Sequence, residues 1–413
     1  MTGDGLPARR AALSLLDAVL RQGRTLDSAA QGIKLPPNDA GLAIAIAGET
    51  LRRLPDLDAA IDSATRQRLP DDSKARMVLR LALAQKAGLG TPDHALVATA
   101  LPLVAGGPRR LVHGVLGTLL RQGITLPEAP TLPPQVEERW ARAWGEEMVL
   151  TARRSIGHRP PLDLSFARDE AARAYPLGDS LAPRQRRIAE AGNVTELPGF
   201  AGGGWWVQDL ASSLPARLIP PEAQTILDLC AAPGGKTMQL AAAGHAVTAV
   251  DRSESRLARL KENLARTELA ADLVAADALT WSPPQEFDAI LLDAPCSATG
   301  TFRRHPEVLY RARPSVIADS AELQARLLDR ASAMLKSGGV LVYAVCSLEP
   351  AEGEEVIAAF LDRAPRFQVA PPVAGELPDG VTSSPPGWVR VLPGMLEPAG
   401  GLDGFFVVRL RSS

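Results

Sequence analysis

The stretch Thr-Ile-Leu-Asp-Leu-Cys-Ala-Ala-Pro-Gly-Gly-Lys-Thr, at residues 225–237, constrains the fold more than any other part of the chain. Its apolar first half predicts a buried parallel strand, Pro233-Gly234-Gly235 predicts a tight turn, and residues 237–243 predict a helix. A strand–turn–helix unit of this kind brings the backbone close to a ligand at the carboxyl end of a strand. The next apolar run, 246–250, ends in Asp251, which is placed to accept hydrogen bonds from a ribose diol.

The same turn lacks the two common phosphate-binding patterns. It is neither Gly-x-x-x-x-Gly-Lys-Ser/Thr nor Gly-x-Gly-x-x-Gly, so nucleoside triphosphates and dinucleotides are disfavoured. An adenosyl ligand without phosphates, such as S-adenosylmethionine, fits better. The alternative is a plain glycine turn that joins a strand to a helix and binds nothing.

Strands and helices alternate through the rest of residues 201–413, which predicts a doubly wound α/β sheet. The expected strands are 273–274, 287–292 and 340–345, the expected helices are 255–267, 316–336 and 352–361, and the runs 388–392 and 404–410 predict a terminal hairpin.

Residues 1–126 predict an all-helical domain, with helices at 8–22, 39–54, 74–88, 94–104 and 109–122 separated by proline and glycine. Residues 127–200 begin with a proline-containing linker and predict a small α/β subdomain, with a helix at 135–154 and strands at 158–166 and 194–197. Trp140 and Trp144, four residues apart on that helix, are more typical of packing than of base stacking. The arginines at 184, 186 and 187 are either a solvated face or a contact for RNA phosphates.

Composition describes an ordinary globular protein, with 46% hydrophobic and 22% charged residues among 413. No apolar run reaches the roughly 18 residues of a membrane span, so we expect no membrane partner. The cysteines form no close pair, so we expect a reducing cytoplasm, and we expect a monomer. The three cysteines, at 230, 296 and 346, have no metal-ligand spacing, so we expect no metal.

Two of these cysteines follow predicted strands. Asp293-Ala-Pro-Cys296 comes after the strand at 287–292, and Cys346 comes after the strand at 340–345. Because ligands of open α/β sheets bind at the carboxyl ends of strands, both thiols are expected beside the ligand of the glycine turn. Two buried structural cysteines are the alternative.

Two thiols and a carboxyl group suit one particular reaction. Carbon 5 of a pyrimidine becomes nucleophilic enough to attack a sulfonium methyl only after a thiolate adds to carbon 6. An acid such as Asp293 can protonate or hydrogen-bond nitrogen 3 as charge develops there. The carbon-5 proton must then leave before the thiol is eliminated, and a second thiol can assist that step.

These motifs resemble the RNA 5-methylcytosine methyltransferases of the RsmB/Sun type. The resemblance is carried by Asp228-Leu-Cys-Ala-Ala-Pro-Gly-Gly-Lys-Thr237, Asp293-Ala-Pro-Cys-Ser-Ala-Thr-Gly300, Arg303-Arg304-His305-Pro306 and Tyr343-Ala-Val-Cys-Ser347. The helical front end, with Thr91-Pro92-Asp93-His94 and Leu111-Val112-His113-Gly114, resembles the NusB-like RNA-binding domain. Together the two resemblances imply a Rossmann-like methyltransferase sheet and cover nearly the whole chain.

The resemblance also implies roles for single residues. Cys346 is the expected nucleophile, Cys296 assists its release, and Lys236 touches Asp293 or the base. The S-adenosylmethionine site is expected to be lined by Cys230, Ala231, Ala232, Pro233, Gly234, Gly235, Lys236, Asp251, Asp277 and Asp293.

The chain departs from the family pattern at two places. Val345 stands where the family usually has threonine, and residues 158–167 lack the arginine and asparagine of the usual pattern. The implied activity is methylation of a cytosine in 16S ribosomal RNA. The alternatives are the same reaction on transfer RNA, a non-catalytic RNA-binding assembly or antitermination factor, and a DNA cytosine methyltransferase that uses Cys296.

Overall fold

The computed structural model describes residues 5–413 and divides into two compact units. The helical unit comprises residues 5–159 together with 302–311. The sheet unit comprises residues 160–301 and 312–413. The predicted boundaries after residues 126 and 200 stay predictions, and residues 127–159 pack with the helical unit.

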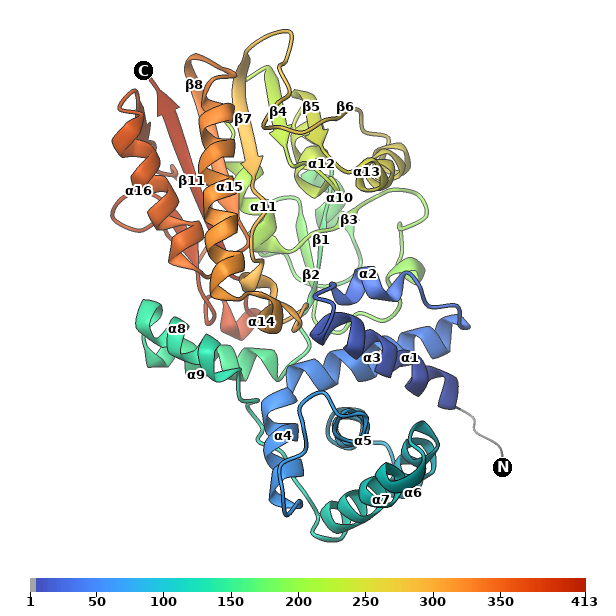
Figure 1. Ribbon diagram of the computed structural model, residues 1–413. Coiled ribbons are helices and arrows are strands. Elements are labelled where there is room, and N and C mark those ends of the chain that lie inside the picture. The colour runs from blue at the N-terminus through green and yellow to red at the C-terminus, as the bar shows by residue number, and fades with distance from the viewer. Residues whose placement is uncertain (1–4) are drawn as a thin grey trace. The chain divides into compact units, whose positions relative to one another are not determined.

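The helical unit is built around one buried helix, α5 (Lys74–Leu89), in which eleven consecutive residues from Ala75 to Gln85 are buried (Figure 1). The other helices of this unit are α1 (Leu6–Leu20), α2 (Leu26–Ala30), α3 (Pro37–Arg52), α4 (Leu54–Ser63), α6 (Asp93–Ala100), α7 (Gly106–Arg121), α8 (Pro134–Trp144), α9 (Glu146–Ile156) and α14 (Val308–Arg311). Apolar residues three and four positions apart face the common core, as in α1, where Ala8, Ala12, Leu15 and Val19 are buried.

One helix prediction is wrong and one helix was not predicted, in ways that glycine and proline explain. The helix expected over 135–154 is interrupted at Gly145, whose backbone has φ +86° and ψ 162°, so α8 and α9 are separate. The helix predicted at 39–54 corresponds to α3, but α4 was not predicted; it has Pro55 in its first turn, where a missing N–H costs nothing. Trp140 is fully buried and edge-on to Phe302 at 5.3 Å, so its packing role is confirmed.

The sheet unit contains a small antiparallel sheet of order β2-β1-β3, formed by β1 (Leu162–Ser165), β2 (Gln185–Ile188) and β3 (Trp206–Val207). The strand expected at 194–197 is instead a 3-10 turn at Val194–Glu196. Of the arginine cluster at 184, 186 and 187, only Arg187 is buried, whereas Arg184 and Arg186 are half-buried. Arg187 is 5% exposed and forms an ion pair with Asp163 at 2.6 Å, while Arg186 donates to three backbone carbonyls.

The large sheet has the order β10-β11-β8-β7-β4-β5-β6, and β9 pairs with β11. Figure 1 labels β11, β8, β7, β4, β5 and β6 of this sheet. Its strands are β4 (Thr225–Leu229), β5 (Ala246–Asp251), β6 (Asp272–Ala275), β7 (Phe287–Asp293), β8 (Leu335–Val345), β9 (Phe367–Val369), β10 (Val389–Val391) and β11 (Phe405–Ser412). From β6 to β8 all neighbours are parallel, whereas β11 is antiparallel to β8 and forms the predicted hairpin with β10.

Helices cover both faces of this sheet. Alternate residues of each strand point to opposite faces. On β7, Ile290 and Leu292 pack with α15 (Pro314–Ser332) and α16 (Glu354–Arg363), while Ala289 and Leu291 pack with α11 (Leu210–Arg217) and α12 (Gly235–Ala242). Helix α13 (Glu254–Thr267) follows β5. Helix α10 (Asp169–Ala174) lies between β1 and β2 of the small sheet in the chain. The predicted fold, an α/β doubly wound sheet with a helical front end and a small α/β part, is confirmed.

Candidate active site

The glycine turn joins β4 to α12 with a backbone that requires glycine at one position. Gly234 has φ +105°, and a Cβ there would lie 2.0 Å from Cδ1 of Leu260 on α13. Both the dihedral angle and the close packing exclude a side chain. The turn is also tied to the end of β5, because Ala231 N–H donates to the carbonyl of Val250 at 3.1 Å and Ala232 N–H donates to Asp251 at 3.2 Å.

Acidic side chains gather around this turn. Asp251 ends β5, is 3% exposed, and accepts one backbone N–H on each carboxylate oxygen, from Ala232 and from Ser253. A carboxylate has about four lone-pair sites, so Asp251 keeps acceptor capacity for a ligand hydroxyl. Asp277, in contrast, is exposed and caps the turn after β6 by accepting from Leu279 N–H.

Asp228, within β4, is completely buried. Its Oδ2 accepts from Thr237 Oγ1 at 2.6 Å, while Oδ1 has no hydrogen-bond partner among the described residues. Burial raises the pKa of Asp228 to about 7, partly offset by the Thr237 hydrogen bond. Burial, followed by the nearby Asp251, also raises the pKa of Cys230 to about 12, so Cys230 is not a thiolate at neutral pH.

Lys236, in the first turn of α12, connects the glycine turn to the end of β7. Its Nζ lies 2.7 Å from Oδ2 of Asp293 and 5.4 Å from the ring centre of Phe405. Burial acts to lower the pKa of Lys236, but the carboxylate of Asp293 outweighs it and the pKa is raised. Cys346 contributes to the same rise, so the ammonium group lies within electrostatic reach of that thiol.

The two cysteines at the strand ends lie together. Cys296 Sγ and Cys346 Sγ are 3.5 Å apart, and Gly300 N–H donates to the carbonyl of Cys346 at 3.0 Å. The hydrogen bond with Cys346, burial and the charge of Glu352 all raise the pKa of Cys296 well above its usual value. Cys346 is the member of this pair that lies within electrostatic reach of the Lys236 ammonium group.

The predicted site residues thus fall into one connected group and one outlier. The turn, Asp251, Lys236 and Asp293 are linked by the contacts above, and the cysteine pair is related to them through the electrostatic effect of Cys346 on Lys236. Among residues 5–413, Asp277 is bonded only within its own turn. Sequence reasoning missed a buried polar cluster behind the cysteines, which contains Ser297, Ser347, Thr299, Gln324 and Glu352. The signal available for it was the serine that directly follows each cysteine.

Two comparisons bear on the family. The model of the 16S rRNA methyltransferase RsmB/F family matches residues 215–411, and the NusB family model matches residues 6–121. The ribosomal RNA small subunit methyltransferase B of Serratia proteamaculans is 34% identical over 390 residues, which cover 86% of this chain and 90% of that protein. The chain belongs to the RsmB/F methyltransferase family.

A further relative agrees with this assignment, and solved structures agree with the fold. The enzyme of the same name from Cronobacter sakazakii is 33% identical and covers 97% of this chain and 98% of its own length. Among solved structures, PH0851 matches with a TM-score of 0.75, 22% identity and 99% coverage of both chains. A methyltransferase homolog from Pyrococcus horikoshii matches with a TM-score of 0.55 and 26% identity, covering 72% of this chain and 98% of its own.

As a member of the RsmB/F family, the protein is an RNA methyltransferase that uses S-adenosylmethionine. The residues present fit that cofactor. An unpartnered buried oxygen on Asp228 and spare acceptor capacity on Asp251 flank a turn without phosphate-binding character. In addition, none of the helices described between residues 5 and 413 is long and apolar enough to cross a membrane.

The position of Asp251 leads to a binding prediction. Asp251→Asn keeps the size of the side chain but replaces an acceptor oxygen with a donor amide, so a ribose hydroxyl loses its partner. We expect S-adenosylmethionine binding to weaken by about 1–3 kcal/mol, measured by titration calorimetry. Asp272→Asn, an exposed residue at the start of β6, is the matched control. Equal affinities of the two variants would remove Asp251 from the cofactor site.

Proposed function

We propose that this protein methylates carbon 5 of a cytosine in small-subunit ribosomal RNA through a covalent adduct with Cys346. The observation that supports this most is the pair of thiols, 3.5 Å apart at the ends of two neighbouring parallel strands, beside the Lys236–Asp293 ion pair. An RNA-binding protein without catalysis has no use for that arrangement. The names of the curated relatives supply the ribosomal substrate.

In the proposed mechanism the Cys346 thiolate forms a bond to carbon 6 of the base. The electron pair of the carbon 5–carbon 6 double bond then becomes available at carbon 5, with charge also shared by nitrogen 3. The Lys236–Asp293 pair provides the hydrogen bond that stabilises this charge. S-adenosylmethionine, when bound, supplies an electrophilic methyl group to carbon 5.

Release requires that the carbon-5 proton leave as a base accepts it. Its electron pair re-forms the carbon 5–carbon 6 double bond, the sulfur–carbon 6 bond breaks, and Cys346 departs as a thiolate. We propose that Cys296 assists this second half, directly or through a water molecule. Its raised pKa, set first by the hydrogen bond with Cys346, keeps it a thiol during the addition step.

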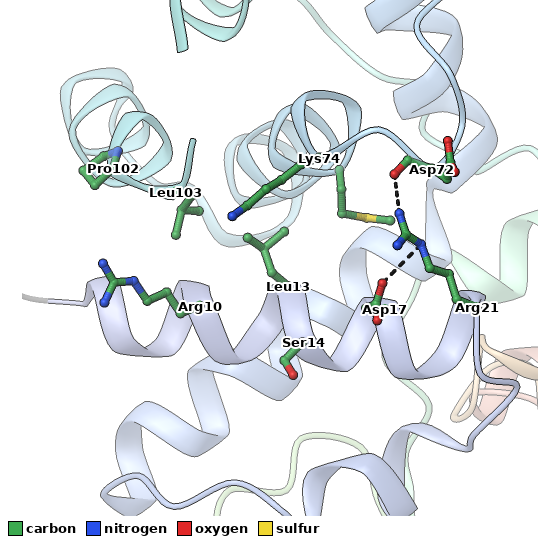
Figure 2. A pocket seen from close by; sticks show the side chains of 10 residues that line it. Arg10, Leu13, Ser14, Asp17, Arg21, Asp72, Lys74, Pro102 and Leu103 are labelled. Atoms are coloured by element: carbon green, nitrogen blue, oxygen red, sulfur yellow. Dashed lines mark hydrogen bonds and ion pairs between the residues drawn. The ribbon is translucent and has the colours of Figure 1, made fainter. Parts of the chain in front are cut away.

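The helical unit is the part for which we propose RNA contact. A cavity of about 500 Å³ lies on it, with Arg10, Lys74, Leu13 and Leu103 among the lining residues (Figure 2). Arg10 and Lys74 are exposed, and within residues 5–413 no hydrogen bond or ion pair occupies either charge. Arg21 at the same cavity is already paired, with Asp17 at 3.2 Å. The two unoccupied cations suit RNA phosphates.

Substitution of each cysteine is expected to block a different step of the reaction. Cys346→Ala should abolish both methylation and any covalent protein–RNA species, because it removes the bond to carbon 6. Cys296→Ala should accumulate a methylated adduct, visible as a denaturation-resistant band that requires RNA and S-adenosylmethionine. A denaturing gel with labelled RNA measures both. An adduct with Cys346→Ala but not with Cys296→Ala would reverse the roles, and full activity of both variants would exclude covalent catalysis.

The cavity on the helical unit gives a second prediction. In the full-length protein, Arg10→Ala and Lys74→Ala should each weaken RNA binding and reduce the salt dependence of log K by about 0.7, because one phosphate contact is lost. Filter binding over a range of salt concentrations measures this. The control is Arg142→Ala, which removes an exposed arginine already paired with Glu138. Slopes equal to that of the control would place RNA contact elsewhere.

A further inference from the structure

Glu352 is a buried carboxylate that none of the steps above uses. It has 0% exposure and ends the 3-10 turn Pro350–Glu352, six residues after Cys346. A carboxylate without solvent is costly unless every oxygen is satisfied, and an apolar residue of similar size would be cheaper at such a position. Its presence therefore calls for a reason beyond stability.

The hydrogen bonds of Glu352 supply that reason, because they come from both cysteine loops. Ser297, next to Cys296, donates its N–H at 2.7 Å to Oε1 and its hydroxyl to Oε2. Ser347, next to Cys346, donates its hydroxyl to Oε2 at 2.5 Å. Thus one carboxylate oxygen receives both serine hydroxyls, one residue away from each thiol.

A fourth donor completes the set of hydrogen bonds to the Glu352 carboxylate. Gln324 on α15 donates its amide to Oε1 at 3.3 Å and also to the carbonyl of Pro295 at 2.9 Å. Tyr343 donates its hydroxyl to the backbone carbonyl of Glu352 at 2.6 Å. Four donors match the acceptor sites of one carboxylate, so the Glu352 side chain is held from α15 and from both loops, while Tyr343 on β8 holds its backbone carbonyl.

We propose that Glu352 is a positioning residue for methyl transfer, whose single carboxylate holds the Cys296 and Cys346 loops at the spacing the reaction requires. The proposal rests on the proposed function, because it assigns the spacing of two thiols to a reaction that uses both. A neutral amide of the same shape cannot replace it, because its NH2 group would face either the two serine hydroxyls or the donors Ser297 N–H and Gln324 Nε2. Its negative charge also disfavours a second thiolate at Cys296.

The test compares Glu352→Gln with Glu355→Gln in the full-length protein. Glu355 is the exposed glutamate three positions along, at the start of α16, and serves as the matched control. We expect Glu352→Gln to lower kcat by roughly 100-fold, while KM for S-adenosylmethionine and RNA changes little, because Glu352 is fully buried behind the two cysteine loops. The control should keep both constants.

A second readout reports the thiol spacing without turnover. Phenylarsine oxide binds two close thiols together: two arsenic–sulfur bonds form, both thiol protons combine with the oxide oxygen, and water leaves. The wild type and Glu355→Gln should each bind one equivalent across Cys296 and Cys346, detected by mass spectrometry after digestion. Glu352→Gln should lose this bridged product.

The outcomes separate this proposal from the proposed function. If the wild type forms no 5-methylcytosine, the proposed function fails. If the wild type is active and Glu352→Gln matches the control in kcat and arsenic bridging, the positioning role is wrong. If Glu352→Gln does not fold, Ser347→Ala takes its place in the test, because it removes only one of the two hydroxyl donors to Glu352. We expect lower kcat and less bridging, and wild-type values for both would overturn the proposal.

Discussion

The parallel pairing of β7 with β8 is the constraint on which the proposed active site depends. Asp293, the last residue of β7, is opposite Ala344 near the end of β8, so the two loops that follow begin side by side. Cys296 lies three residues after Asp293 and Cys346 lies two residues after Ala344, and their sulfur atoms are 3.5 Å apart although fifty positions separate them in sequence. A register shift of one residue would turn each of these side chains to the opposite face.

The glycine turn extends this constraint to the cofactor side. Because α12 starts directly after Gly234, Lys236 projects from its first turn to the end of β7, where it meets Asp293. One ammonium group therefore connects the loop expected to bind the methyl donor with the residues expected to bind the base. In the buried polar cluster, Glu352 binds the serine that follows each cysteine. Hydrogen bonds therefore hold the two cysteine loops in place.

Much of this was accessible from sequence because the signals are local. The run at 225–237 predicted its strand, turn and helix, and the parallel order of βα units predicted that Cys296 and Cys346 would lie at one sheet edge. Non-local contacts were not accessible. Phe302–Arg311 interrupts the methyltransferase stretch but packs with the helical unit, where Tyr310 donates to the carbonyl of Leu51 at 2.7 Å. Glu352 was likewise hidden, since its partners come from three separate segments.

Bisulfite sequencing of total RNA tests most directly the proposal that this protein methylates a cytosine of small-subunit ribosomal RNA. Comparing a strain that lacks the gene with its parent should show one cytosine in that RNA that loses protection, and the wild-type gene should restore it. Loss of protection only in transfer RNA would change the substrate. An unchanged pattern across all RNA would contradict the account.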